Sequence, residues 1–160
     1  MPNSTIEIYT DGSFIKNKNG IKCGYGIYFP NGEYKSIGRK FTHTPITNNR
    51  AELYAIFKTI ILCNIINEKR IIRNEIKIKE IIIYTDSEYS MKSLTIWYKK
   101  WIKNGKKYLN KDIIDLIIDA MADASFKIKI KHVRAHTGKK DPQSIANDVA
   151  DELAKKGANK

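Results

Sequence analysis

Two stretches with the same ending decide the fold: IEIYTDGS at residues 6–13 and IIIYTDSE at residues 81–88. Each is a short apolar run typical of a strand, and each ends in Tyr-Thr-Asp before a small residue. If the two strands are parallel neighbours, Asp11 and Asp86 emerge side by side at the carboxyl edge of the sheet, where α/β sites form. A single Asp there is more often a turn former, but a repeated one predicts a cation between two repelling carboxylates.

The surrounding patterns predict a mixed α/β sheet flanked by helices. The run at 81–84 is apolar on both faces, as in a central parallel strand, whereas 126–133 alternates with lysine like an edge strand. Strands are expected at residues 5–10, 24–29, 34–41, 81–84 and 126–133, the first three as an antiparallel meander. Helices are expected from the N-cap Thr47, from residue 88, and at 111–124 and 144–156. Residues 67–79 fit either helix or strand.

Length and composition favour one globular domain over residues 1–160. Because there is no signal pattern and no apolar run of membrane-spanning length, we expect an intracellular protein, in the cytoplasm or another compartment that contains DNA. We also expect a monomer. The formal net charge of +12 suits a nucleic-acid partner, although 24 lysines against 5 arginines can also reflect compositional bias. Cys23 and Cys63 match no zinc or redox spacing and are expected as buried, free thiols.

Two helices each offer one more acid for the predicted metal site. Glu52 precedes Ile56 and Ile60 by one and two turns, so it points along the buried stripe, where a carboxylate requires a partner. The helix dipole explains a Glu in a first turn but not this orientation. In the last helix, Asp151 borders the apolar stripe and Asp148 falls on the far side. Helical spacing therefore selects Asp151 over Asp148.

Five motifs, in order, resemble those of type 1 ribonuclease H, the cellular enzymes that cut RNA in RNA–DNA hybrids: YTDGS, TNNRAEL, YTDSEY, VRAHTG and NDVADELA. The resemblance implies the RNase H-like fold, with a five-stranded mixed sheet flanked by helices. We expect a single catalytic domain over residues 1–160 and no separate hybrid-binding domain, because the first predicted strand begins within ten residues of Met1. The resemblance assigns the metal-binding carboxylates of the family to Asp11, Glu52, Asp86 and Asp151. These would hold two Mg²⁺ ions, with Mn²⁺ as an alternative, for hydrolysis that leaves 5′-phosphate and 3′-hydroxyl ends.

The same resemblance assigns further roles. An acid–base helper on a mobile loop falls on His136, and a phosphate-pocket hydroxyl falls on Thr47. Minor-groove contacts, which would read 2′-hydroxyls, fall on Gly12, Ser13, Asn17, Asn48 and Asn49. A basic protrusion falls on the stretch IWYKKWIKNGKKYLNK, whose substrate contacts would be Trp97, Lys99, Lys100, Lys103, Lys106 and Lys107.

Two departures from the family pattern and two alternatives stay open. The segment after Asp11 lacks the glycine- and proline-rich sequence that is usual in the family, and Pro45 occupies a position where many relatives have an arginine. The first alternative is a catalytically silent hybrid-binding module, which would keep the lysines and lose an acid. The second is the RNase H domain of a reverse transcriptase or retroelement. The four acids argue against the first, and the initial Met1 with a complete last helix favours a free-standing enzyme over the second.

Overall fold

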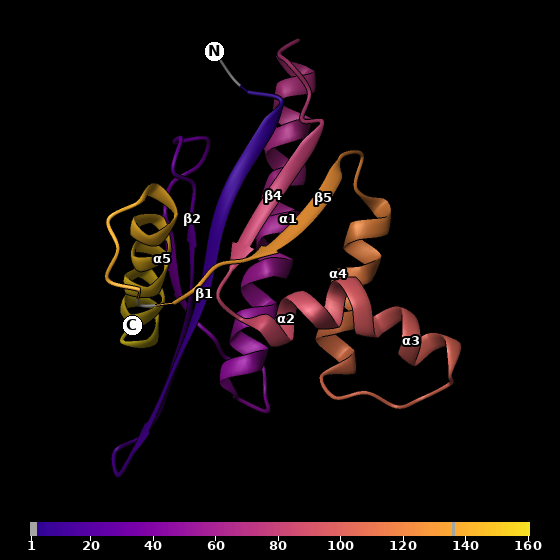
Figure 1. The fold of residues 1–160 in the computed structure, drawn as a ribbon. Coiled ribbons are helices and arrows are strands. Elements are labelled where there is room, and N and C mark those ends of the chain that lie inside the picture. Colours follow the sequence, from indigo (N-terminus) through magenta and orange to yellow (C-terminus); the bar gives the residue numbers. More distant parts are fainter. Residues whose placement is uncertain (1–2, 136) are drawn as a thin grey trace.

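The computed structural model describes residues 3–135 and 137–160 and contains one five-stranded sheet (Figure 1). The strand order is β3-β2-β1-β4-β5. The strands are β1 (Thr5–Asn17), β2 (Gly20–Tyr28), β3 (Ile37–Lys40), β4 (Glu80–Thr85) and β5 (Lys127–His132). The pairs β1–β2 and β2–β3 are antiparallel, whereas β1–β4 and β4–β5 are parallel. The predicted mixed sheet, with a lysine-bearing strand at its edge, is confirmed.

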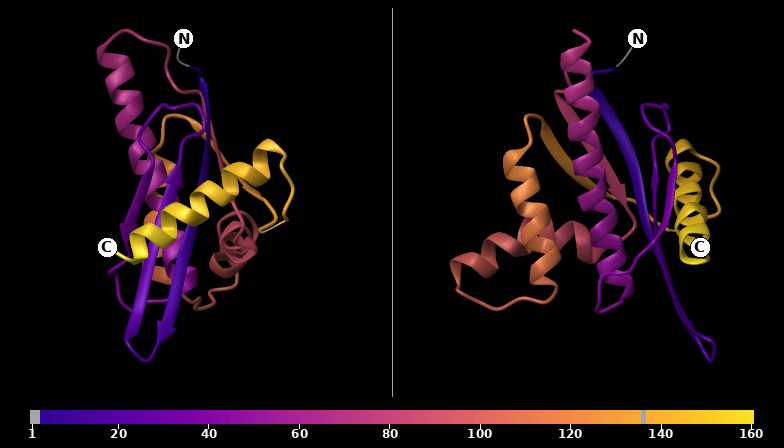
Figure 2. Two further views of the ribbon diagram at one scale, coloured as in Figure 1. Left: turned by 90° about the vertical axis from the view of Figure 1, so that its left-hand side faces the viewer. Right: turned by 180° about the vertical axis from the view of Figure 1, so that it is seen from behind.

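Helices cover both faces of this sheet (Figure 2). One face packs against α1 and α4 in the larger core, and the other packs against α5. The helices are α1 (Asn48–Ile72), α2 (Glu88–Lys92), the π-helical turn η1 (Ser93–Trp97), α3 (Tyr98–Lys103), α4 (Lys111–Asp123) and α5 (Pro142–Ala158). In the part of the chain that the structure describes, no helix is long and apolar enough to cross a membrane.

The helix α5 lies unusually close to the sheet because glycine occupies the contact positions of β2. A Cβ atom on Gly24 would lie 2.2 Å from the backbone nitrogen of Ala158, and one on Gly26 would lie 2.4 Å from the carbonyl oxygen of Ala150. Real Cβ atoms do not approach so closely, so larger residues would push the helix away. This close packing sets the distance between the sheet and the acidic side chains of α5.

The helix α1 begins at a side-chain cap and extends into the segment whose structure the sequence left open. The Thr47 hydroxyl accepts a hydrogen bond from the backbone nitrogen of Arg50 at 3.1 Å, which confirms the predicted N-cap. Ile56 and Ile60 are fully buried. The helix continues to Ile72, so the ambiguous segment 67–79 is helix first and then a connection to β4.

Three strand boundaries differ clearly from the sequence prediction, and one of them is the start of β2, which lies at Gly20 instead of residue 24. The strand β1 extends to Asn17 instead of ending near residue 10, because β2 continues to pair with it as far as Gly20. The strand β3 is shorter than expected, because only residues 37–40 pair with β2. Cys23 and Cys63 are buried and free, as predicted.

Candidate active site

Three acids from different elements converge at the carboxyl end of β4. Tyr9 pairs with Tyr84 and Thr10 with Thr85 in the parallel β1–β4 ladder, so Asp11 and Asp86 follow in adjacent positions, as predicted. Glu52 reaches them from the first turns of α1. Oxygen atoms of the three carboxylates lie within 4.8 Å of one another.

The carboxylate of Glu52 is oriented by two groups that the sequence analysis did not identify in this role. The backbone N–H of Gly12 donates to Glu52 Oε1 at 2.5 Å and also contacts Asp11 Oδ1 at 2.9 Å. The buried Thr85 hydroxyl donates to Glu52 Oε2 at 3.5 Å. A side chain at Gly12 would lie 2.9 Å from the backbone nitrogen of Glu52, so only glycine permits this approach.

Asp11 and Glu52 are almost completely buried, and this changes their acid–base behaviour. Burial raises the pKa of the Asp11 carboxyl, and the negative charge of Glu52 raises it further. Burial likewise raises the pKa of Glu52, although its hydrogen bonds with Asp11 and Gly12 oppose that shift. Within the described residues, neither carboxylate forms an ion pair with a basic side chain. The cluster therefore has a deficit of positive charge.

The helix α5 supplies a fourth acid to this cluster. The Asp151 carboxylate is close enough to raise the pKa of the Asp11 carboxyl, whereas Asp148 is exposed, in agreement with the predicted facing. Lys155 Nζ lies 3.0 Å from Asp151 Oδ2, one helical turn away. A hollow of about 430 Å³ is lined by Gly138, Asp148, Asp151, Glu152 and Lys155. Asp151 therefore borders both the acidic cluster and an open space.

The donor set of this cluster fits a divalent metal ion. Carboxylate oxygens are the ligands that Mg²⁺ prefers, and a bound cation would relieve the repulsion that burial intensifies. Asp11, Glu52 and Asp86 offer such oxygens from three elements, with Asp151 beside Asp11. The arrangement can therefore bind hard cations without a nitrogen or sulfur ligand.

The predicted minor-groove and phosphate contacts lie in three different environments. Thr47, Asn48 and Asn49 are exposed at the start of α1, close in sequence to Glu52. Gly12 and Ser13 follow Asp11 in β1, and Ser13 is buried. Asn17 lies at the far end of β1, where its side-chain oxygen accepts a hydrogen bond from the Asn19 backbone at 2.9 Å. His136 lies outside the described residues.

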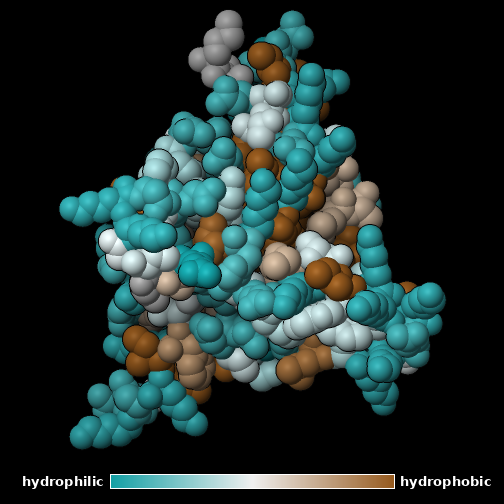
Figure 3. Space-filling view, in the orientation of Figure 1, coloured by the Kyte–Doolittle hydropathy of each residue, from teal (hydrophilic) through white to brown (hydrophobic). Residues whose placement is uncertain are grey.

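The predicted protrusion extends away from the body of the molecule around α3 (Figure 1). Aromatic side chains hold it together: Trp101 stacks on Tyr108 with ring centroids 4.9 Å apart, and Trp97 lies 6.1 Å from Trp101. Hydrophilic side chains cover this corner of the surface (Figure 3). The five predicted phosphate contacts are all exposed: Lys99, Lys100, Lys103, Lys106 and Lys107.

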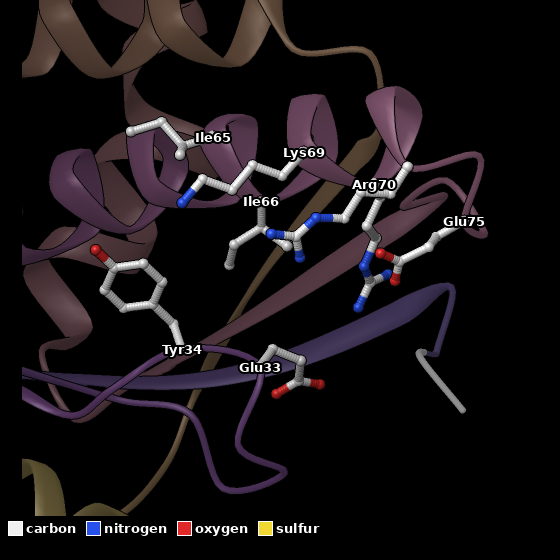
Figure 4. Close-up of a pocket in the computed structure, with 8 residues that line it drawn as sticks. Glu33, Tyr34, Ile65, Ile66, Lys69, Arg70 and Glu75 are labelled. Atoms are coloured by element: carbon white, nitrogen blue, oxygen red, sulfur yellow. The ribbon is translucent and has the colours of Figure 1, made fainter.

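A pocket of about 260 Å³ lies far from this centre, between the end of α1 and the segment that follows β2 (Figure 4). Basic and acidic side chains share its wall with Tyr34 and two isoleucines. Its charged residues are Glu33, Lys69, Arg70, Arg73 and Glu75. None of the predicted site residues lines it, so the acidic cluster remains the candidate active site.

Comparison with known proteins agrees with the fold and the acidic cluster. The family model for RNase H matches residues 3–159. The chain belongs to the RNase H family. A ribonuclease H from Schizosaccharomyces pombe is 33% identical over 159 residues, which cover 95% of this chain and 52% of the relative. Ribonuclease HI from Haemophilus influenzae is 31% identical over 159 residues, which cover 96% of this chain and 89% of the relative.

A human relative agrees with this family assignment, and a solved structure agrees with the fold. Ribonuclease H1 from Homo sapiens is 30% identical over 160 residues, which cover 96% of this chain and 50% of the relative. The chain therefore spans about half the length of the human and S. pombe relatives. The solution structure of the PFV RNase H domain superimposes with a TM-score of 0.70 and 22% identity, covering 96% of this chain and 94% of that chain. This last likeness concerns the fold alone.

Proposed function

We propose that this chain hydrolyses the RNA strand of RNA–DNA hybrids with two divalent metal ions, Mg²⁺ or Mn²⁺, and leaves 5′-phosphate and 3′-hydroxyl ends. The observation that carries the proposal is the cluster of Asp11, Glu52 and Asp86, whose carboxylate oxygens lie within 4.8 Å of one another. Membership of the RNase H family supports it, as do relatives named ribonuclease H.

The four acids would hold the metal through carboxylate oxygens. When bound, two such ions activate a water molecule and stabilise the leaving oxygen of the phosphodiester. The protein prepares the ligands in advance: Gly12 and Thr85 orient Glu52, and burial shields Asp11 and Glu52 from water. Lys155 forms an ion pair with Asp151 on the open side of the cluster.

Substrate recognition would involve the surfaces on both sides of the acids. The exposed side chains of Asn48 and Asn49 offer donors and acceptors for 2′-hydroxyl groups, which distinguish RNA from DNA. Thr47 and the start of α1 suit a phosphate, since helix N-termini bind anions. The protrusion lysines would contact the DNA backbone without reading sequence. His136 would assist proton transfer or product release from its loop.

One labelled sequence, prepared as hybrid, duplex RNA, duplex DNA and both single strands, tests this proposal. Each form is incubated with the protein in the presence and absence of Mg²⁺. We expect cleavage of the hybrid alone, and only with the metal ion. Equal cleavage of duplex DNA, or no cleavage of any form with Mg²⁺, would refute the proposal.

A further inference from the structure

The strands β1 and β2 continue beyond the sheet as a two-stranded projection. The parallel partner β4 pairs only with residues 5–10 of β1, and β3 pairs only with residues 24–27 of β2. Residues 14–23, which we call the β1–β2 arm, form ladder pairs with each other, from Phe14 opposite Cys23 to Asn17 opposite Gly20; at the base, the Cys23 carbonyl also accepts a hydrogen bond from the Phe41 backbone. Figures 1 and 2 show this arm extending past the start of α1.

The arm is a defined structure and not a loose loop. Its turn consists of two residues, Lys18 and Asn19, and Gly20 follows with a φ of +112°, which favours glycine. The Asn17 side chain closes the turn through its bond to the Asn19 backbone. At the base, Cys23 is buried and Phe14 packs against the main core. The tip therefore continues the same strand that carries Asp11.

The chemistry of the arm is cationic and partly apolar. Lys16, Lys18 and Lys22 are exposed, and no acidic residue occurs between Asp11 and Glu33 in the sequence. Neither Lys16 nor Lys18 has an ion-pair or hydrogen-bond partner among the described residues; Lys22 only contacts the Asn159 side chain, at 3.3 Å.

Two isoleucines are exposed on the same arm. Ile15 and Ile21 retain 43% and 47% of their surface. Because an isolated two-stranded hairpin is at best marginally stable in water, this exposure favours a partner that covers the arm. The register pairs Ile15 with Lys22 and Lys16 with Ile21, so each face of the arm carries one cation beside one apolar side chain. That combination suits a phosphate backbone with its adjoining sugars.

The position of the arm relative to the acids points to a long polyanion. Asn17 is six positions beyond Asp11, which corresponds to about 20 Å along a strand. The same length along a duplex covers about six base pairs. The protrusion around α3 lies on the other side of the acid-bearing end of β4 in both Figure 1 and the rear view of Figure 2. A duplex that crosses the acids can therefore reach both basic elements.

We propose that the β1–β2 arm is a further phosphate-binding element, which holds a nucleic-acid duplex about six base pairs from the acidic cluster. The choice of an RNA–DNA hybrid as the duplex rests on the proposed function. The arm and the protrusion then hold the substrate on opposite sides of the acids. The alternative is that these lysines only keep the hairpin solvated and bind no partner. The experiments must exclude it.

The first test compares two triple variants of equal charge in metal-free buffer, where hybrid binding is followed by fluorescence anisotropy over a range of salt concentrations. One variant carries K16Q, K18Q and K22Q. The control carries K77Q, K79Q and K127Q, which are exposed near the starts of β4 and β5. We expect the arm variant to lower the log–log salt slope by about two to three and the control to lower it by less than about one. Equal slopes for the two variants would overturn the proposal.

The second test measures where the arm lies on the duplex. Lys18→Cys provides a site for a photo-cross-linker, because Cys23 and Cys63 are buried and burial raises the pKa of both thiols. We expect cross-links in a narrow window about six base pairs from the cleavage position. Cross-links spread evenly along the duplex would overturn the proposal. A protein that binds the hybrid but cleaves nothing would refute the proposed function, while the salt slopes would still decide the role of the arm.

Discussion

The ion pair between Arg50 and Asp112 gives the sharpest prediction about stability. Arg50 follows the exposed Asn48 and Asn49, but its side chain is only 3% exposed. Its guanidinium group donates two hydrogen bonds of 2.8 Å to the Asp112 carboxylate and one of 3.2 Å to the Thr44 carbonyl. The pair therefore fixes the start of α1 to the start of α4. We expect Asp112→Asn to destabilise the fold because it leaves a buried cation without its counter-ion.

The magnitude follows from the exposure of the two partners. Removal of one partner of a fully buried pair costs about 3–5 kcal/mol. The Asp112 side chain is 64% exposed, so solvent screening reduces the expected loss to about 1–3 kcal/mol. For a chain of 160 residues, a loss of about 2 kcal/mol lowers the Tm by about 4–8 °C. Glu88→Gln is the control, since it breaks a pair with Lys92 in which the Glu88 side chain is 61% exposed, and it should change the Tm little.

The pH dependence of stability provides an independent test of the contribution of this ion pair. The hydrogen bonds from Arg50 lower the pKa of Asp112 to about 2 from an ordinary value of 3.8. A depressed folded-state pKa contributes stability above the unfolded value, and that stability is lost as the pH falls toward the folded value. Thermal melts should therefore show the advantage of the wild type over Asp112→Asn at pH 5 and its loss between about pH 4 and pH 2. A variant that melts within about 1 °C of wild type at pH 5 would refute the reasoning.

Four further predictions concern the acids, the metal ion, the histidine and the lysines. Asp151→Asn should abolish hybrid cleavage, whereas Asp148→Asn should retain near-normal kcat because its side chain is exposed; the reverse result would contradict the assignment of α5. Mg²⁺ should raise the Tm of the wild type but not of Glu52→Gln, measured by thermal denaturation, because a bound cation offsets the charge of the cluster. His136→Ala should lower kcat by about tenfold to a hundredfold in steady-state assays and leave Mg²⁺ affinity unchanged. Neutralisation of the five protrusion lysines should raise KM and reduce the log–log salt slope of hybrid binding by roughly two to four, with little effect on kcat. These lysines are Lys99, Lys100, Lys103, Lys106 and Lys107.

Local patterns were sufficient to predict how the acids converge. The repeated Tyr-Thr-Asp ending predicted adjacent parallel strands, and the ladder aligns Tyr9 with Tyr84. Helical spacing predicted that Glu52 is buried and that Asp148 faces solvent. These predictions succeed because burial imposes a strict period on strands and helices, and a polar residue that violates the period stands out.

Features that depend on contacts between distant segments were not predictable from the sequence. The β1–β2 arm was missed because its alternation of lysine, asparagine and isoleucine carries no strong strand signal, and its pairing is visible only once β2 is in place. The pair of Arg50 and Asp112 joins residues 62 positions apart. The role of Gly12 as a donor to Glu52 arises from the backbone and leaves no trace in side-chain patterns.

The most direct test of the central claim is an end-group analysis of one hybrid labelled on each strand in turn. With wild-type protein and Mg²⁺, we predict that the RNA strand is cut to products with 5′-phosphate and 3′-hydroxyl ends and that the DNA strand stays intact. Asp11→Asn should cut neither strand, since it removes one of the clustered carboxylates. Cuts in the DNA strand, or RNA products with 2′,3′-cyclic phosphates, would contradict the account, because the second result means that the 2′-hydroxyl and not water attacks the phosphorus.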